Sequence, residues 1–374
     1  MGAIVLALLL VVLPLAGWAA EAPLSIRGKA GILGDIDSGT VLFEHNADVR
    51  LEPASLTKVM TLYLIYEALA KGDLTLETRL PVSEKAWRVG GSKTFVKVGD
   101  QVRLEDLILG IAVQSGNDAC MVVAEYLGGS VEGFALMMNT KAKSLGMNGT
   151  HFVNSSGLPD PDHYTTARDL FTLAKALMSH FPQYSHYSRE KQYTYNGIRQ
   201  HNRNRLLWQD PSVTGLKTGH TQDAGYCLIA TYEKDSQRLA AVVLGADRRE
   251  HREADALMLL RYGNRFYETV KLFEAGAVVR TMRVWKGAVS EVKAVVKEAL
   301  AVTVLRKERS SLEVGLLYDE PIVAPLKAGD PLGSVVVKLA NKEVRKVPVV
   351  AEVEVPESGI IGRTMDSLRL FMGW

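Results

Sequence analysis

The stretch Pro53-Ala54-Ser55-Leu56-Thr57-Lys58-Val59-Met60-Thr61 carries a serine followed, one helical turn later, by a lysine. The proline and the apolar spacing after it predict a helix over 55–71. Residues three apart share a helix face, so the Ser55 hydroxyl and the Lys58 amine should lie together. A neutral amine is a base that can activate a hydroxyl for nucleophilic attack. Taken alone, the pair is better explained as a helix N-terminus with a serine cap.

Two further motifs change that interpretation, Ser115-Gly116-Asn117 and then Lys217-Thr218-Gly219. The three motifs in this order and with wide gaps describe a serine acyl-transfer site. In such a site Ser115 relays a proton to the leaving amine, and Asn117 binds either Lys58 or a substrate amide.

The third motif is expected on the edge of a strand that docks substrate. Lys58 can act as a base only if burial or a nearby positive charge lowers its pKa, and Lys217 is expected to offer such a charge across the cleft. Gly219 lets a substrate backbone approach the strand closely.

Composition sets the class of protein. The chain has 374 residues, 47% of them hydrophobic and 23% charged, and a net charge of +2. These values fit a globular protein of two domains with no bias toward nucleic acid. No Cys/His cluster has the spacing of a zinc site, and we expect neither a metal nor a cofactor. Cys120 and Cys227 are expected to be buried free thiols, although a disulfide between them is left open.

The two ends suggest export and a membrane surface. Residues 1–20 are nearly all apolar and lead into the cleavage pattern Ala20-Glu21-Ala22. This predicts a signal peptide over 1–22 although a basic start is missing; an uncleaved anchor is the alternative. Residues 357–374 contain an amphipathic helix with Trp374 at its end, suited to lie in the membrane interface. The alternative is a helix packed on its own protein.

Between the ends we expect an α+β domain at 23–275, an antiparallel sheet packed by helices, and a valine-rich all-β domain at 276–356. In the first domain the expected strands are 30–36, 40–44, 225–232 and 239–245, and the expected helices are 55–71, 104–109, 119–127, 134–145, 166–179 and 250–267. In the second domain the expected strands are 292–296, 301–305, 322–325, 332–339 and 342–350.

Two further stretches join Pro53–Thr61: Gln114-Ser115-Gly116-Asn117-Asp118-Ala119-Cys120 and Gly215-Leu216-Lys217-Thr218-Gly219-His220-Thr221. With these three stretches the chain resembles the D-alanyl-D-alanine carboxypeptidases, low-molecular-mass penicillin-binding proteins of the DacA type. The resemblance implies a serine β-lactamase/transpeptidase-like catalytic domain. It implies removal of the terminal D-alanine from peptidoglycan pentapeptide stems through an acyl-enzyme on Ser55, which β-lactams also acylate. It further implies a peripheral protein on the periplasmic face of the bacterial cytoplasmic membrane; a homodimer is left open.

The resemblance also implies roles for single residues. The backbone N–H groups of Ser55 and His220 would form the oxyanion hole. Thr218 and Arg203 resemble the residues that receive the terminal carboxylate of the substrate. Asp169 matches an acid that family members place near the site. Some relatives have histidine at the position of Ser156, so a deacylation role for that histidine does not transfer to this chain.

Two other functions were weighed. A class A-like β-lactamase needs a glutamate with asparagine four residues later, and Glu125, Glu132 and Glu190 each lack it. A non-catalytic peptidoglycan-binding protein has no need of Ser55, Lys58 and Lys217 together.

Overall fold

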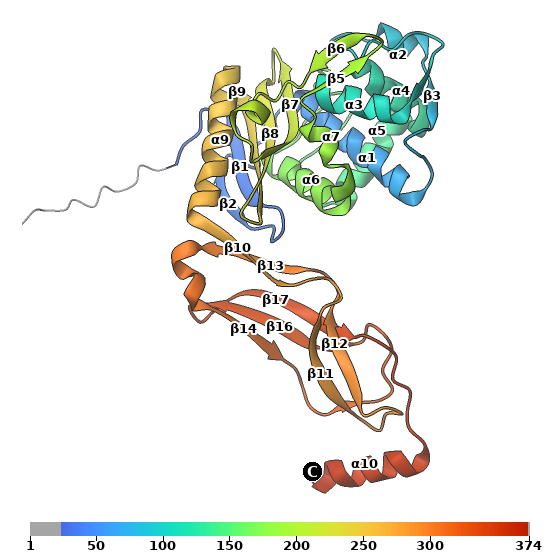
Figure 1. The fold of residues 1–374 in the computed structure, drawn as a ribbon, viewed down its shortest axis with the longest axis vertical. Helices are drawn as coiled ribbons and strands as arrows, with labels where there is room; N and C mark the ends of the chain where they lie inside the picture. The colour runs from blue at the N-terminus through green and yellow to red at the C-terminus, as the bar shows by residue number, and fades with distance from the viewer. Residues whose placement is uncertain (1–23, 373–374) are drawn as a thin grey trace, which may run out of the picture.

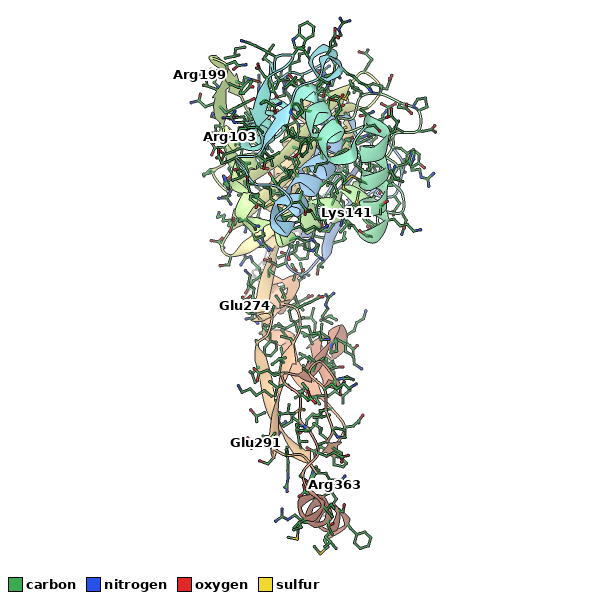
Figure 2. The ribbon with its side chains drawn as sticks, turned by 90° about the vertical axis from the view of Figure 1, so that its right-hand side faces the viewer. Arg103, Lys141, Arg199, Glu274, Glu291 and Arg363 are labelled. Atoms are coloured by element: carbon green, nitrogen blue, oxygen red, sulfur yellow. The ribbon has the colours of Figure 1, made fainter. Side chains whose placement is uncertain are left out.

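The computed structural model describes residues 24–372, and the chain forms an elongated molecule with two domains in line and a helix at the far end (Figure 1). Figure 2 follows the long axis from Arg199 in the first domain, past Glu274 and Glu291, to Arg363 on the last helix. The signal peptide expected at 1–22 and the terminal Trp374 lie outside the described residues.

A five-stranded antiparallel sheet, in the order β2-β1-β9-β8-β7, organises the first domain. Alternate side chains of its central strands face opposite sides. Ile229 and Val242 pack in one core with the helices α1 and α6, whereas Leu228 and Val243 pack in a second core with α9. Because both faces of the sheet are buried, its central strands are continuous apolar runs in the sequence. The strands are β1 Ala30–Asp35, β2 Val41–His45, β7 Val213–Thr221, β8 Gly225–Lys234 and β9 Gln237–Ala246.

Helices cover both faces of the sheet and fill the rest of the domain (Figure 1). The helix expected from 55 begins as a short 3₁₀ turn and continues as α1 to Lys71, where Gly72 ends it at φ +78°. The helices are η1 Ala54–Thr57, α1 Lys58–Lys71, α2 Glu84–Arg88, α3 Leu104–Leu109, η2 Gly110–Gln114, α4 Asn117–Gly128, α5 Val131–Ser144, α6 Ala167–His180, η3 Pro182–Tyr184, α7 His186–Arg189, α8 Leu206–Gln209 and α9 Arg249–Phe266.

Two short hairpins complete this domain, β3 Arg79–Pro81 with β4 Gln101–Arg103 and β5 Gln192–Tyr195 with β6 Ile198–His201. In residues 24–372 no single helix is long and apolar enough to cross a membrane; α4 and α5 have the length and composition only when taken together, and they meet at 82°.

The second domain is all-β around a core of valines, with a two-stranded sheet of β10 and β13 and a six-stranded sheet in the order β14-β16-β17-β12-β11-β15. The helix expected to end at 267 ends at Phe266, and β10 follows at once and pairs with β13, ahead of the boundary expected at 276. The strands β10, β11 and β14 were not predicted. The elements are β10 Tyr267–Phe273, β11 Val278–Trp285, β12 Glu291–Val296, β13 Leu300–Leu305, η4 Arg306–Ser311, β14 Leu312–Leu317, β15 Ile322–Val323, β16 Pro331–Leu339, β17 Lys342–Ala351 and, beyond the sheets, α10 Ile360–Met372.

Hydrogen bonds fasten the two domains together at the turn between β1 and β2. Thr269 of β10 donates to the Asp35 carboxylate at 2.5 Å, and the hydroxyls of Ser38 and Thr303 lie 2.7 Å apart. The contacts therefore join the first turn of the first domain to both strands of the small sheet, β10 and β13.

Candidate active site

A cleft of about 560 Å³ lies where the edge strand β7 meets η1 and the turn between η2 and α4. It brings together residues of all three motifs with a set of basic side chains. The residues that line it are Ser55, Ser92, Ser115, His201, Asn202, Arg203, Arg205, Thr218, Gly219, His220, Tyr226, Arg249 and Arg252.

Lys58 is fully buried and its Nζ has three partners. It lies 2.9 Å from Ser55 Oγ, 2.8 Å from Asn117 Oδ1 and 2.6 Å from the backbone oxygen of Ser156. Burial lowers the pKa of Lys58 to about 8, and the positive charge of Arg203 acts in the same direction. A neutral amine has two N–H groups and one lone pair. The amide and backbone oxygens take the two N–H groups, so the lone pair is left for the Ser55 hydroxyl.

Ser115 and Lys217 meet on the other side of the cleft. The π-helical turn η2 ends at Gln114, and Ser115 caps it in a left-handed conformation at φ +67°. Lys217 Nζ lies 3.0 Å from Ser115 Oγ and 2.9 Å from the Thr218 backbone oxygen. Burial, with the charge of Lys58 added, lowers the pKa of Lys217 well below its usual value. Burial, one of the two causes expected from the sequence, is also the largest cause of the lowered pKa of Lys58; the positive charge that acts with it is that of Arg203.

Gly219 allows the strand edge to approach the serine. A Cβ at this position would lie 3.0 Å from the Pro53 oxygen, 3.2 Å from the Ala54 Cβ and 3.2 Å from the Ser55 backbone nitrogen. Real Cβ contacts are rarely this short, so a side chain here would push β7 away from η1. The backbone of β7 and the backbone N–H of Ser55 therefore lie side by side because residue 219 is glycine.

Arg203 projects from the loop after β6 into the cleft wall. Asn202 and Asn204 hold this loop, with side-chain amides that donate to the backbone oxygens of Glu190 at 2.9 Å and Gly215 at 2.8 Å. Among the described residues no carboxylate pairs with the Arg203 guanidinium. The cleft therefore has a positive group free to meet an anion next to Thr218.

Asp169 is not brought to the cleft. It lies in the first turn of α6, and its carboxylate accepts hydrogen bonds from the Gly149 N–H at 2.8 Å and the Thr150 hydroxyl at 2.7 Å. Its contacts hold the chain before Thr165 against α6, so its place in this fold is structural.

Sequence reasoning missed three contributions to the site. The carboxylate of Asp118 accepts N–H groups from the loop 94–96 at 2.7 to 3.3 Å and holds that loop against the second motif. The partner of Lys58 at position 156 is a backbone oxygen, which no side-chain pattern reveals. Arg252 comes from α9 and belongs to no motif, so only its place in the fold shows it.

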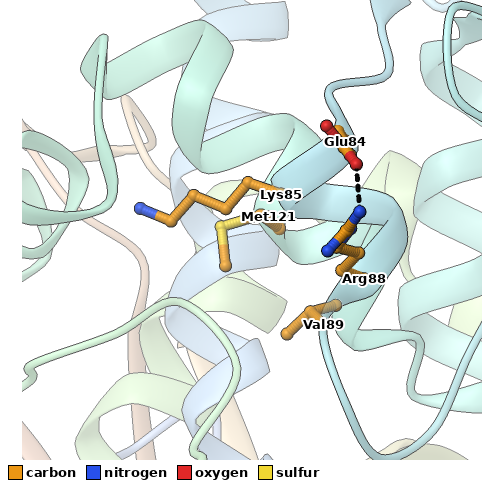
Figure 3. Close-up of a pocket in the computed structure, with 5 residues that line it drawn as sticks. All are labelled: Glu84, Lys85, Arg88, Val89 and Met121. Carbon is orange, nitrogen blue, oxygen red and sulfur yellow. Dashed lines mark hydrogen bonds and ion pairs between the residues drawn. The ribbon is translucent and has the colours of Figure 1, made fainter.

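A second depression lies between α2 and α4, away from the motifs (Figure 3). Its charged groups include Arg88 and Glu84, which form an ion pair with each other. Lys85, Val89 and Met121 complete the lining. No serine, threonine or cysteine lies among these residues, so the cleft at Ser55 is the better candidate.

Cys120 and Cys227 are both free and buried, as the sequence suggested. Burial raises the pKa of each thiol to about 11, so both are neutral at ordinary pH.

Known proteins are similar to this chain in sequence and in structure. A family model described as D-alanyl-D-alanine carboxypeptidase matches residues 17–248, and one described as penicillin-binding protein 5, C-terminal domain, matches residues 267–357. The D-alanyl-D-alanine carboxypeptidase DacC of Escherichia coli is 42% identical over 95% of this chain and 90% of its own length.

Solved structures agree with the family match. Penicillin-binding protein 5 of Haemophilus influenzae has a TM-score of 0.82 at 34% identity, covering 90% of this chain and 99% of that one. Penicillin-binding protein D2 of Listeria monocytogenes, in an ampicillin-bound form, has a TM-score of 0.60 at 31% identity, covering 65% of this chain and 100% of that one. Matched in sequence over most of its length and in structure over both domains, the chain belongs to the D-alanyl-D-alanine carboxypeptidase family.

Proposed function

We propose that this protein is a serine-type D-Ala-D-Ala carboxypeptidase that removes the terminal D-alanine from pentapeptide stems of peptidoglycan. The observation that carries the proposal is the position of Ser55 Oγ, 2.9 Å from a buried lysine whose two N–H groups have other acceptors. Family membership supplies the substrate class, since the relatives are named for this activity.

The acylation half-reaction uses Ser55 and Lys58. Ser55 Oγ attacks the carbonyl carbon of the penultimate D-alanine, and its proton passes to Lys58 Nζ. The carbonyl oxygen becomes negative and is received by the N–H groups of Ser55 and His220. The intermediate collapses when the C–N bond breaks, which leaves an ester on Ser55.

The leaving amine needs a proton at that moment. Ser115 donates its hydroxyl proton to the amine nitrogen and regains one from Lys217, which lies 3.0 Å away. D-Alanine then departs as the free amino acid. Asn117 holds Lys58 in place through its Oδ1, 2.8 Å from Nζ.

Hydrolysis of the ester completes the cycle. Before this step Lys58 gives up to solvent the proton that it took from Ser55, and Lys217 regains one from solvent, so both lysines return to their starting state. A water then attacks the ester carbonyl and gives a proton to Lys58, which passes it to Ser55 Oγ as the ester bond breaks and the hydroxyl is regenerated. Lys58 meets residue 156 through the backbone oxygen, while the Ser156 side chain contacts Asn154. The contact between residue 156 and Lys58 therefore does not depend on the side chain at position 156. We assign the role of base in deacylation to Lys58.

Arg203 and Thr218 are proposed to bind the terminal carboxylate of the substrate. A free guanidinium at the cleft wall suits a carboxylate, and a site built for that anion restricts cleavage to the last residue of the stem.

β-Lactams are proposed as covalent inhibitors that acylate Ser55, a proposal supported by the ampicillin-bound relative. We propose that the chain is exported by the segment 1–22 and that α10 holds it on the periplasmic face of the cytoplasmic membrane. The β domain then acts as a spacer. This anchor is supported by the exposed apolar side chains of α10 at the end of the molecule distant from the catalytic domain (Figure 1).

Labelled penicillin and a peptide ending in D-Ala-D-Ala test the proposed function. We expect a stable adduct on Ser55 and release of one D-alanine per peptide. Rapid turnover of penicillin indicates a β-lactamase, and no reaction with either reagent indicates a binding protein; each of these results contradicts the proposal.

A further inference from the structure

The first turn of α9 places Arg252 behind the end of β7. Its Nη1 donates to the Gly219 backbone oxygen at 3.0 Å and to the Cys227 backbone oxygen at 3.2 Å. Gly219 and Cys227 lie opposite each other in β7 and β8. One guanidinium nitrogen therefore holds both strands at the point where β7 borders the cleft.

The carbonyl that Arg252 contacts belongs to the same peptide unit as the N–H of His220. In a planar trans peptide the C=O and the N–H point in opposite directions. The Gly219 oxygen faces Arg252 and β8, so the His220 N–H faces the free edge of β7. That edge borders η1, where the Ser55 nitrogen lies 3.2 Å from the position of a Cβ at Gly219.

The guanidinium keeps its charge for these contacts. Arg252 is 4% exposed, and its Nη2 lies 4.0 Å from Glu253 Oε1. At 4.0 Å this contact is too long for a hydrogen bond, so the acid neutralises Arg252 weakly. A hydrogen bond from a charged donor is roughly twice as strong as a neutral one, and bonds in series strengthen one another by about 10–30%.

The His220 side chain is supported from the same direction. The rings of His220 and Tyr226 lie 4.1 Å apart at 34°, and the Arg252 Cζ lies 5.6 Å from the centre of the Tyr226 ring. Arg252 therefore supports His220 in two ways. It binds the peptide group that precedes His220, and it lies near the Tyr226 ring that contacts the His220 ring.

We propose that Arg252 is a positioning residue for the oxyanion hole: it fixes and polarises the Gly219–His220 peptide, and so orients and strengthens the His220 N–H that receives the negative oxygen of the tetrahedral intermediate. The proposal rests on the proposed function, because it assigns that N–H to an acyl-transfer reaction.

Infrared difference spectroscopy of the penicillin adduct tests it. Penicillin labelled with ¹³C at the β-lactam carbonyl marks the ester on Ser55, and the stretching frequency of that ester falls with the strength of the hydrogen bonds that its oxygen accepts. In Arg252→Gln and Arg252→Lys we expect the band at higher frequency than in the wild type. Removing a whole oxyanion donor costs about 10²–10³ in rate, and weakening one should slow acylation about tenfold with the non-covalent affinity for penicillin nearly unchanged.

Arg249→Gln is the matched control. It removes one positive charge from the same cleft at a residue whose ion pair is with Glu250. We expect its ester band at the wild-type frequency. An equal shift in Arg249→Gln overturns the proposal, because it traces the effect to the general field of the cleft.

Thermal unfolding of each variant checks that it is folded. If Arg252→Gln does not fold, Arg252→Lys is used in its place, because it keeps a charge beside Glu253 but loses the guanidinium geometry. An unshifted band in a folded Arg252→Lys overturns the proposal. If the wild type forms no penicillin adduct, the proposed function is wrong. This result differs from a wild-type adduct whose ester band is unshifted in the Arg252 variants, which contradicts only the role proposed for Arg252.

Discussion

The backbone N–H of Lys286 donates to the Asp366 carboxylate at 2.7 Å, which fastens α10 to the loop between β11 and β12. Asp366 lies on the polar face of α10. On the apolar face, Ile361 is 82% exposed and Phe371 is 90% exposed. The β domain therefore holds α10 by one face and leaves the other exposed, as the proposed membrane anchor requires.

Truncation after Pro356 should release the enzyme from membranes without changing its chemistry. The helix touches the β domain and not the cleft, so kcat on a small soluble peptide should equal that of the full chain. Sedimentation with anionic vesicles and D-alanine release measure the two properties. The pair of changes Ile361→Gln and Phe371→Gln should weaken sedimentation, and Ser367→Gln serves as control. Loss of activity or folding on truncation would show that the helix is part of the protein body.

Ser55→Ala should abolish both D-alanine release and covalent labelling by penicillin. Of the residues in the cleft, Ser55 alone places its hydroxyl against Lys58. Mass spectrometry of the labelled wild type identifies the acylated residue, and Ser144→Ala, on the surface of α5, is the control that should label normally. An adduct on Ser115 would refute the assignment.

Lys58→Arg should be inactive although the positive charge is kept, because a guanidinium stays protonated at any working pH. Losing a general base costs roughly 10²–10⁴ in rate. Stopped-flow acylation by a chromogenic β-lactam measures it, and near-normal acylation would place the base elsewhere.

The pH dependence of acylation in the wild type follows from the pKa of Lys58, which burial lowers to about 8. The active form is the neutral amine, so the rate constant should rise as pH increases through about 8 and then level off. A rate constant that falls over this range would exclude a lysine base with that pKa.

Arg203→Gln should remove the requirement for a terminal carboxylate. In the wild type, converting the terminal carboxylate to an amide should cost about 1.5–3 kcal/mol in kcat/KM, the range for a hydrogen bond to a charged group. In Arg203→Gln the two substrates should react at similar rates. Equal kcat/KM for both substrates in the wild type would argue against the docking of the carboxylate at Arg203.

Asp118→Asn should destabilise the loop beside the second motif. The buried carboxylate accepts N–H groups from Thr94, Phe95 and Val96, and an amide can accept with only one of its two atoms. We expect a loss of about 1–3 kcal/mol in the free energy of unfolding, measured by denaturant titration. The surface variant Asp100→Asn should stay within experimental error, and an unchanged stability in Asp118→Asn would show that the loop is held by other contacts.

The three motifs and the helix at Ser55 were predictable because short-range spacing fixes them. The role of Arg252 was not predictable. It acts on two backbone oxygens from a helix that begins 30 residues after Gly219, and the sequence around it is typical of an ordinary charged helix start. Asp169 shows the converse case, because a family match gives position in the chain but not distance from the cleft. The strand β10 was missed because Tyr267 follows α9 without any turn residue to mark the change.

The helix α9 begins behind the cleft at Arg249 and passes directly into β10, so 18 residues, about 27 Å of rigid rod, connect the reaction centre to the stalk. The hydrogen bonds at Asp35 and Ser38 close the joint between the domains, so the proposed anchor α10 would hold Ser55 at a fixed height above the membrane. An enzyme held in this way would select its substrates partly by their position. We expect stems at the height of the cleft to be trimmed, and identical stems above or below that height to keep their last residue. Altering the stalk length alone should then redistribute pentapeptides through the depth of the wall.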